Sequence, residues 1–192
     1  ESPFYTITNT LPKVVGTAEN PVNIYLDEGT YSPSTNGESL PIVMFSFINL
    51  IGQGEEFTIL DAEQTSGVIT MEYCDNNTIS DLTITGGLAE GASPNNYGGG
   101  ILLYWSHPTL TYVTISGNTA DDGGGMYLTS SNPTLTHVTI NENTGTGMSL
   151  VLSNPTLTHV TISGNNSRGM YLMYSNPTLT HVTISGNNSR GM

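Results

Sequence analysis

Few side chains in this sequence have the type and spacing that catalysis requires. A glycoside hydrolase needs two carboxylates at a defined separation, and the closest pair in the second half of the chain is Asp121-Asp122, followed by Glu142. Asp121 and Asp122 are weak candidates for a calcium site, because a hard cation takes six or more oxygen ligands. We therefore expect no catalytic residue, no metal centre and no cofactor, with calcium as the one ion that this turn would accept.

The basic and nucleophilic side chains indicate no clearer site. A polysaccharide lyase uses Arg or Lys as its base, but Arg168 and Arg190 have no acidic residue near them in the sequence. Cys74 is the only cysteine, so it forms no intrachain disulfide and is interpreted as a buried structural thiol. If the chain is an enzyme, lyase and hydrolase chemistry are the two alternatives, and a non-catalytic role is favoured over both.

A repeat sets the positions of these residues. The segment SNPTLTHVTISGNNSRGM occurs without change at residues 153–170 and 175–192, and two looser copies begin at His107 and Asn132. The prolines that mark the copies are spaced by 25, 22 and 22 residues: Pro108, Pro133, Pro155 and Pro177. Such a period is typical of solenoids.

Each copy predicts short strands joined by corners. Its apolar residues occur in pairs two positions apart, Val160/Ile162 and Met170/Leu172, and Gly, Asn and Pro lie between the pairs. One such coil buries too few apolar side chains to offset the entropy of ordering it, so the coils must stack. Stacked coils pair equivalent strands in parallel and in register, about 4.8 Å apart. The sequence therefore predicts an all-β parallel β-helix of seven or eight coils with about 22 residues each.

Equivalent residues of stacked coils form columns along the molecule. The predicted inward columns are Leu110/Leu135/Leu157/Leu179, Val113/Val138/Val160/Val182, Ile115/Ile140/Ile162/Ile184, Ile101/Met126/Met148/Met170/Met192 and Leu103/Leu128/Leu150/Leu172. A structural asparagine ladder is predicted at one corner, at Asn118, Asn143, Asn165 and Asn187. A further column, His137/His159/His181 headed by Tyr112, favours ring-on-ring packing over metal binding.

Two outward faces are candidates for binding. One carries two threonine columns, which resemble the ice-binding face of insect β-solenoid antifreeze proteins: Thr109, Thr134, Thr156 and Thr178, and Thr111, Thr136, Thr158 and Thr180. The other is a predicted contact face for a sugar or a protein partner, rich in aromatic and apolar side chains: Leu102, Tyr104, Trp105, Tyr127, Tyr171, Met173 and Tyr174.

The segment GGGILLYWSHPTLTYVTISGNTADDGGGMYL, residues 98–128, resembles the secreted bacterial right-handed parallel β-helix repeats of the pectin-lyase-like class. It is also similar to polymorphic outer-membrane protein repeats, in which a GGxI signature alternates with an aromatic-x-x-N signature. Ile115 and Ile140 stand where the second signature has Phe. The resemblance implies a right-handed coil and an extracellular setting, and it implies no particular reaction.

The amino-acid composition limits the classes of binding partner that we expect. Asp and Glu number 16 against three Lys and Arg, giving a formal net charge of −13, which argues against binding to nucleic acid or to an anionic membrane surface. The sequence contains no apolar run long enough for a membrane span. We expect a single domain, with an N-terminal cap and the first strands in residues 1–40 and the β-helix coils in residues 41–192. The chain begins at Glu1 without Met, from which we expect a processed, secreted product.

Three functions are compatible with these features. The preferred hypothesis is a secreted or cell-surface structural β-solenoid, such as an adhesin stalk, surface element or filament subunit. Such a solenoid would associate with itself or continue into further repeats through an open end at Gly191-Met192. The alternative is a carbohydrate-binding or polysaccharide-lyase-like β-helix that uses the contact face and the inserted loop at residues 88–96. The second alternative is ice binding through the threonine columns.

Overall fold

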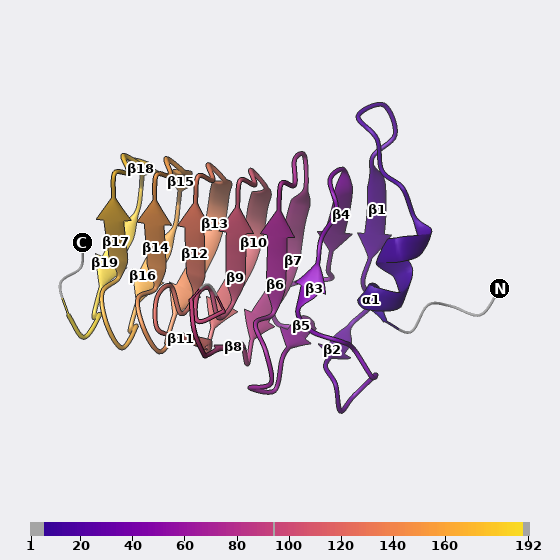
Figure 1. The fold of residues 1–192 in the computed structure, drawn as a ribbon, viewed down its shortest axis with the longest axis horizontal. Helices are drawn as coiled ribbons and strands as arrows, with labels where there is room; N and C mark the ends of the chain where they lie inside the picture. Colours follow the sequence, from indigo (N-terminus) through magenta and orange to yellow (C-terminus); the bar gives the residue numbers. More distant parts are fainter. Residues whose placement is uncertain (1–5, 94, 190–192) are drawn as a thin grey trace.

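The chain winds into an elongated coil of parallel strands (Figure 1). The structure is a computed structural model, and it describes residues 6–93 and 95–189. The described chain makes about seven turns of about 25 residues. The predicted all-β parallel β-helix is confirmed.

Within residues 6–93 and 95–189, the strands form three parallel sheets of 11, six and two strands. The 11-stranded sheet contains β1 (Val22–Tyr25), β2 (Gly29–Tyr31), β4 (Ile48–Ile51), β5 (Thr58–Asp61), β7 (Thr78–Thr85), β10 (Thr109–Ser116), β13 (Thr134–Asn141), β15 (Thr156–Thr158), β16 (Thr161–Ser163), β18 (Thr178–Thr180) and β19 (Thr183–Ser185). The six-stranded sheet contains β3 (Ile42–Val43), β6 (Ile69–Glu72), β9 (Ile101–Tyr104), β12 (Met126–Thr129), β14 (Met148–Val151) and β17 (Met170–Met173). The two-stranded sheet pairs β8 (Leu88–Ala89) with β11 (Thr119–Ala120).

The predicted inward columns form the core. Leu110 pairs with Leu135, and that register continues through Leu157 to Leu179. Side chains in these columns are fully buried through most of the coil, whereas Leu179 in the last described turn is 38% exposed. Met192, which the sequence places in the methionine column, lies outside the described residues, as do Arg190 and Gly191.

The length of a turn varies along the molecule. Ladder partners in the two C-terminal turns are 22 residues apart, as the identical repeats predict. Asn118 and its ladder partner Asn143 are 25 residues apart, and Gly87 and Asn118, which flank the loop at residues 88–96, are 31 residues apart. The strands keep a constant register, so the extra residues are accommodated at the corners, where loops extend below the sheets (Figure 1).

A short helical segment closes the N-terminal end of the core (Figure 1). It consists of α1 (Ile7–Thr10) and the 3₁₀ helix η1 (Leu11–Lys13), and Ile7 and Leu11 join the buried core. The buried Glu38 carboxylate accepts hydrogen bonds from the backbone N–H groups of Ile7 and Thr8, at 2.6 and 3.0 Å. A carboxylate at a helix N-terminus accepts hydrogen bonds from free N–H groups, and its negative charge interacts favourably with the positive end of the helix dipole. β1 already pairs with β4, and the division into residues 1–40 and 41–192 stays a prediction.

Two polar ladders hold the corners. The side-chain oxygens of Asn143, Asn165 and Asn187 each accept from the backbone N–H and the Nδ2 of the asparagine one turn earlier, at 2.9 to 3.1 Å. The oxygen of Asn118, the first member, accepts from the Gly87 backbone N–H at 2.8 Å. At another corner, the backbone N–H of one turn donates to the serine Oγ of the next turn at 3.0 Å: Cys74 to Ser106, Ser106 to Ser131, Ser131 to Ser153 and Ser153 to Ser175. These bonds satisfy polar groups that the stacked corners remove from water.

Candidate functional site

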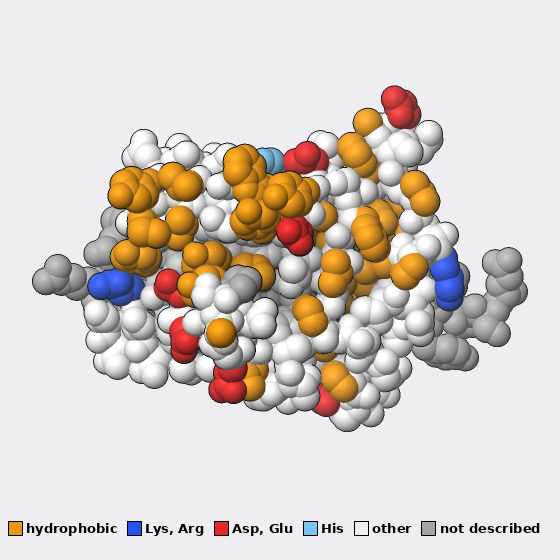
Figure 2. All heavy atoms as spheres, in the orientation of Figure 1, with side chains coloured by type: hydrophobic (Ala, Val, Ile, Leu, Met, Phe, Trp, Pro, Cys, Tyr) orange, Lys and Arg blue, Asp and Glu red, His pale blue; other side chains and the backbone are white. Residues whose placement is uncertain are grey.

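The outward face of the six-stranded sheet presents two columns of side chains. The first column is Thr70, Leu102, Tyr127, Ser149 and Tyr171, and the second is Glu72, Tyr104, Thr129, Val151 and Met173. Hydrophobic side chains gather over these strands in Figure 2. An exposed stripe of this kind is typical of a contact surface.

Tyrosines line a hollow of about 490 Å³ on this face, between β6 and β12. Tyr97 and Tyr127 stack with their ring centroids 4.5 Å apart and an interplanar angle of 10°. Tyr73 and Tyr104 meet edge to face, with centroids 5.4 Å apart and an angle of 88°. Thr70, Glu72, Leu102 and Thr129 complete the lining. The hollow thus combines aromatic surfaces with hydroxyl groups and one carboxylate.

The local environment raises the pKa of two of these tyrosines, Tyr73 and Tyr127. A hydrogen bond with Tyr104 raises the pKa of Tyr73, with smaller contributions from desolvation and from the charges of Tyr104 and Glu72. Burial raises the pKa of Tyr127, and the nearby Tyr97 and Asp122 add to the effect. Near neutral pH the Tyr73 and Tyr127 side chains are therefore neutral phenols, which donate and accept hydrogen bonds beside their apolar faces.

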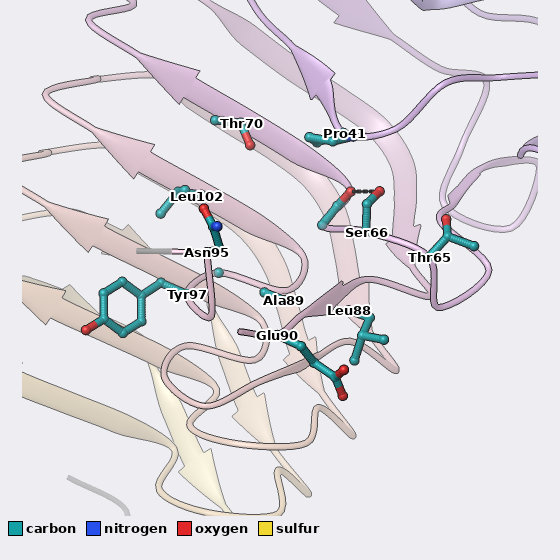
Figure 3. Close-up of a pocket in the computed structure, with 12 residues that line it drawn as sticks. Pro41, Thr65, Ser66, Thr70, Leu88, Ala89, Glu90, Asn95, Tyr97 and Leu102 are labelled. Carbon is teal, nitrogen blue, oxygen red and sulfur yellow. Dashed lines mark hydrogen bonds between the residues drawn. The ribbon is translucent and has the colours of Figure 1, made fainter. Parts of the chain in front are cut away.

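The inserted loop builds one wall of this site. Tyr97 and Asn95 approach Leu102 of β9 and Thr70 of β6, beside a second hollow of about 430 Å³ (Figure 3). The loop is fixed by the pairing of β8 with β11, and by a 2.8 Å hydrogen bond from Asn96 Nδ2 to Asp121 Oδ2. Thr70, Tyr97 and Leu102 line both hollows, so the two hollows lie side by side on this face.

The structure brings together some of the predicted contact residues and separates others. Leu102, Tyr104 and Tyr127 line the tyrosine hollow, whereas Tyr171 and Met173 lie on β17, with β14 between them and β12. Trp105 and Tyr174, which were predicted, share one corner column with Tyr73, which was not. All three residues have a positive φ. Tyr73, Trp105 and Tyr174 are 62%, 50% and 83% exposed.

Sequence reasoning missed Tyr73, Tyr97, Thr70 and Glu72. The residues around Val68–Tyr73 fit two strand registers that differ by one residue, so the outward residues of β6 were not assigned. In the structure Ile69 and Met71 face the core and Glu72 is exposed. Tyr97 follows an insertion that has no counterpart in the repeat. One feature of the sequence could have identified Tyr73, namely the alignment of Tyr73-Cys74 with Trp105-Ser106. The serine ladder shows that these two pairs occupy equivalent positions in successive turns.

The threonine columns lie on the 11-stranded sheet. Thr109, Thr134, Thr156 and Thr178 are exposed and in register, and the column of Thr111, Thr136, Thr158 and Thr180 runs beside them. Next to them the rings of Tyr112, His137, His159 and His181 stack with centroids 4.9, 4.9 and 4.7 Å apart. The stacked imidazoles fill a corner position where each residue has a positive φ.

The two adjacent carboxylates Asp121 and Asp122 have hydrogen-bond partners in the structure. Asp121 Oδ2 accepts from Asn96, and Asp122 Oδ1 accepts from Ser149 Oγ at 2.8 Å. Among residues 6–93 and 95–189 no group of three or more His, Cys, Asp or Glu side chains is placed to hold a metal ion. Cys74 is buried, and desolvation is the main cause of its raised pKa, so its thiol has little thiolate character. No helix in the described part has the length and apolar character of a membrane span.

Comparisons with known proteins place this chain in a family. Residues 48–192 match the family described as right-handed beta helix region, and the chain belongs to that family. Comparison with curated proteins gives no match.

The comparison with solved structures finds two that are similar to this chain to different degrees. A substituted pectin methylesterase in complex with a hexasaccharide aligns over 88% of this chain and 52% of its own, with 12% identity and a TM-score of 0.60. The A-module of the mannuronan C-5 epimerase AlgE6 of Azotobacter vinelandii aligns over 95% and 72%, with 14% identity and a TM-score of 0.33. This chain spans about half the length of the pectin methylesterase. The first likeness establishes the fold and not an activity.

Proposed function

We propose that this chain is a non-catalytic, carbohydrate-binding β-helix of the secreted or cell-surface type, and that sugar rings bind in the tyrosine hollow. The observation that carries the proposal is the pairing of four tyrosines around one depression, two of them stacked and two in edge contact. Aromatic faces pack against the apolar faces of sugar rings, and phenol hydroxyls can bond sugar hydroxyls.

The shape of the site supports binding along a chain of sugars. The second hollow, drawn in Figure 3, adjoins the tyrosine hollow through the lining residues Thr70, Tyr97 and Leu102 that they share. The outward columns extend towards β17, the first of them past the fully buried Ser149. The pectin methylesterase with the similar coil was solved with a hexasaccharide, which is consistent with a coil of this shape supporting an extended ligand.

The site offers little for hydrolysis. Glu72 is the only carboxylate among the described residues that line the tyrosine hollow, whereas glycoside hydrolysis uses a pair of carboxylates. Arg168 lies over the Tyr171 ring, 5.0 Å from its centroid, on the far side of β14 from the hollow. The proposal is therefore binding without bond cleavage.

Replacing Tyr104 tests the proposal. Tyr104 is 38% exposed and its side chain faces outward, so Tyr104→Ala should leave the fold intact and weaken glycan binding about tenfold. Isothermal titration against a panel of neutral, acidic and amino-bearing oligosaccharides measures the change. Tyr25→Ala is the matched control, because Tyr25 is 68% exposed on β1 of the other sheet and should bind as the unchanged protein does.

The same experiment distinguishes carbohydrate binding from the second candidate function, that of a structural solenoid. That role is supported by the asparagine, serine and histidine ladders, which repeat from turn to turn and could join coils of one chain or of several. If no glycan binds, or if Tyr104→Ala and Tyr25→Ala have equal effects, the carbohydrate proposal is wrong and self-association is favoured. Ice binding would instead use the threonine columns and be insensitive to Tyr104→Ala.

A further inference from the structure

We infer that the tyrosine hollow selects oligosaccharides that carry amino groups and rejects those that carry uronate carboxylates. This inference rests on the proposed function and specifies the ligand class of the same site. It follows from the negative charges that lie around the tyrosines and from the absence of Lys and Arg among the described residues that line the two hollows.

Glu72 lies next to the key aromatic residue. It pairs in register with Tyr104 in the neighbouring strand, so the two side chains project outward about 4.8 Å apart. The Glu72 side chain is exposed and lines the hollow together with Tyr73 and Tyr104. Its negative charge is one of the causes that raise the Tyr73 pKa. A cation bound over these rings would therefore meet a carboxylate at their edge.

A second carboxylate flanks the other aromatic pair. Asp122 forms a parallel bridge with Tyr97, and its charge contributes to the raised pKa of Tyr127. Its Oδ1 accepts one hydrogen bond from Ser149, a neutral donor. Glu90 lines the second hollow, but its carboxylate points away from Tyr97 (Figure 3), so it carries no part of the argument.

Positive side chains are remote from this site. The described residues that line the two hollows include no Lys or Arg, and Figure 2 shows blue side chains only towards the two ends of this face. Arg168 is occupied over the Tyr171 ring on β17. With a formal net charge of −13 for the whole chain, the hollow lies in a negative field that repels polyanions.

An ammonium group suits both features of the hollow. It is attracted to the negative face of a tyrosine ring and to an adjacent carboxylate. A uronate carboxylate would be placed beside Glu72 with no cation to compensate it, which is a repulsive arrangement that excludes the wrong ligand. The occupant predicted by these charges is a glucosamine-type oligosaccharide.

Three hexasaccharides that differ in charge test the inference: a glucosamine hexamer, an N-acetylglucosamine hexamer and a galacturonate hexamer. Isothermal titration at a pH where the amino groups are protonated should show the glucosamine hexamer binding at least about tenfold more tightly than its N-acetylated counterpart. The galacturonate hexamer should not bind. The preference should shrink as salt is added, because salt screens charges at an exposed site.

Glu72→Gln isolates the local carboxylate from the overall charge. It should lower the affinity for the glucosamine hexamer about threefold to tenfold and leave the N-acetylated hexamer unchanged. Glu28→Gln is the control, because Glu28 is exposed, precedes β2 and lines neither hollow. Equal effects of the two substitutions would show that overall charge, and not the hollow, attracts the ligand, and would overturn the inference.

The outcomes distinguish this inference from the proposed function. If the N-acetylated or galacturonate hexamer binds as tightly as the glucosamine hexamer, and Tyr104→Ala weakens that binding, the inference is wrong and carbohydrate binding at the hollow stands. If none of the three hexamers binds, the inference is wrong. The proposed function is then judged by the wider panel with Tyr104→Ala and Tyr25→Ala.

Discussion

Each buried asparagine of the ladder forms hydrogen bonds with residues of the turns before and after it. Asn143 is 1% exposed; its oxygen accepts from the N–H and Nδ2 of Asn118, and its own Nδ2 donates to Ile115 O and to Asn165 Oδ1. A ladder of this kind keeps every buried amide satisfied, and removal of one member leaves its partners without bonds in a site that excludes water. The cost of such a change therefore falls on two neighbouring turns.

Replacing Asn143 by Ala should destabilise the protein by about 3 kcal/mol, because the buried Asn118 backbone N–H loses its acceptor and Ile115 O loses the Asn143 Nδ2 donor, although Asn118 Nδ2 keeps its bonds to Ile84 O and Ser116 O. Urea denaturation followed by circular dichroism measures the loss. Asn166→Ala is the control, since Asn166 is exposed and its backbone bond to Asn143 O is kept in the variant. A loss for Asn143→Ala no larger than that for Asn166→Ala would contradict the ladder's role.

At the scale of elements, glycines let β12 and β14 start beside the asparagine ladder. A Cβ on Gly125 would lie 2.6 Å from Gly147 O, 2.6 Å from Ile140 Cγ2 and 3.0 Å from Asn143 Nδ2. These distances are shorter than a carbon atom tolerates, and two of the three contacts belong to groups fixed by the sheet and its ladder. The glycine that directly precedes Met126 is thus required by the close approach of consecutive turns.

Gly125→Ala should lower the free energy of unfolding by about 2–3 kcal/mol through overpacking, as measured by thermal or urea denaturation. Gly67→Ala provides the comparison, because its Cβ would make only ordinary contacts, at 3.5 Å to Gly98 O and 3.6 Å to Gly99 O. The explanation fails if both variants unfold at the same denaturant concentration.

The strands and core columns could be predicted because identical turns repeat the same register. Once Leu157 is aligned with Leu179, the other inward positions of those turns follow from the identical sequence of the two copies. The tyrosine hollow could be predicted only in part. Tyr104 and Tyr127 belong to the repeat, whereas Tyr73 lies after a strand whose register the sequence leaves open. Tyr97 is placed by a loop that pairs with β11, and nothing in the periodic pattern specifies where such a loop folds.

At the scale of the whole molecule, the coil separates a polar sheet from an aromatic one. The 11-stranded sheet exposes threonines and the stacked histidines, while the six-stranded sheet exposes tyrosines, aliphatic side chains and Glu72. Because each face extends along the stacked turns (Figure 1), a long ligand can contact several strands at once. The charge of the chain then decides which long ligands approach the face.

The most direct measurement of the central claim is an NMR titration of the protein with ring-labelled tyrosine. The chain has ten tyrosines, and Tyr→Phe substitutions assign their signals. Addition of the glucosamine hexamer should shift the signals of Tyr73, Tyr97, Tyr104 and Tyr127 and leave those of Tyr25, Tyr31 and Tyr112 in place. Shifts confined to Tyr112 or Tyr25, or no shift in any ring at saturating hexamer, would contradict binding of the glucosamine hexamer in the tyrosine hollow.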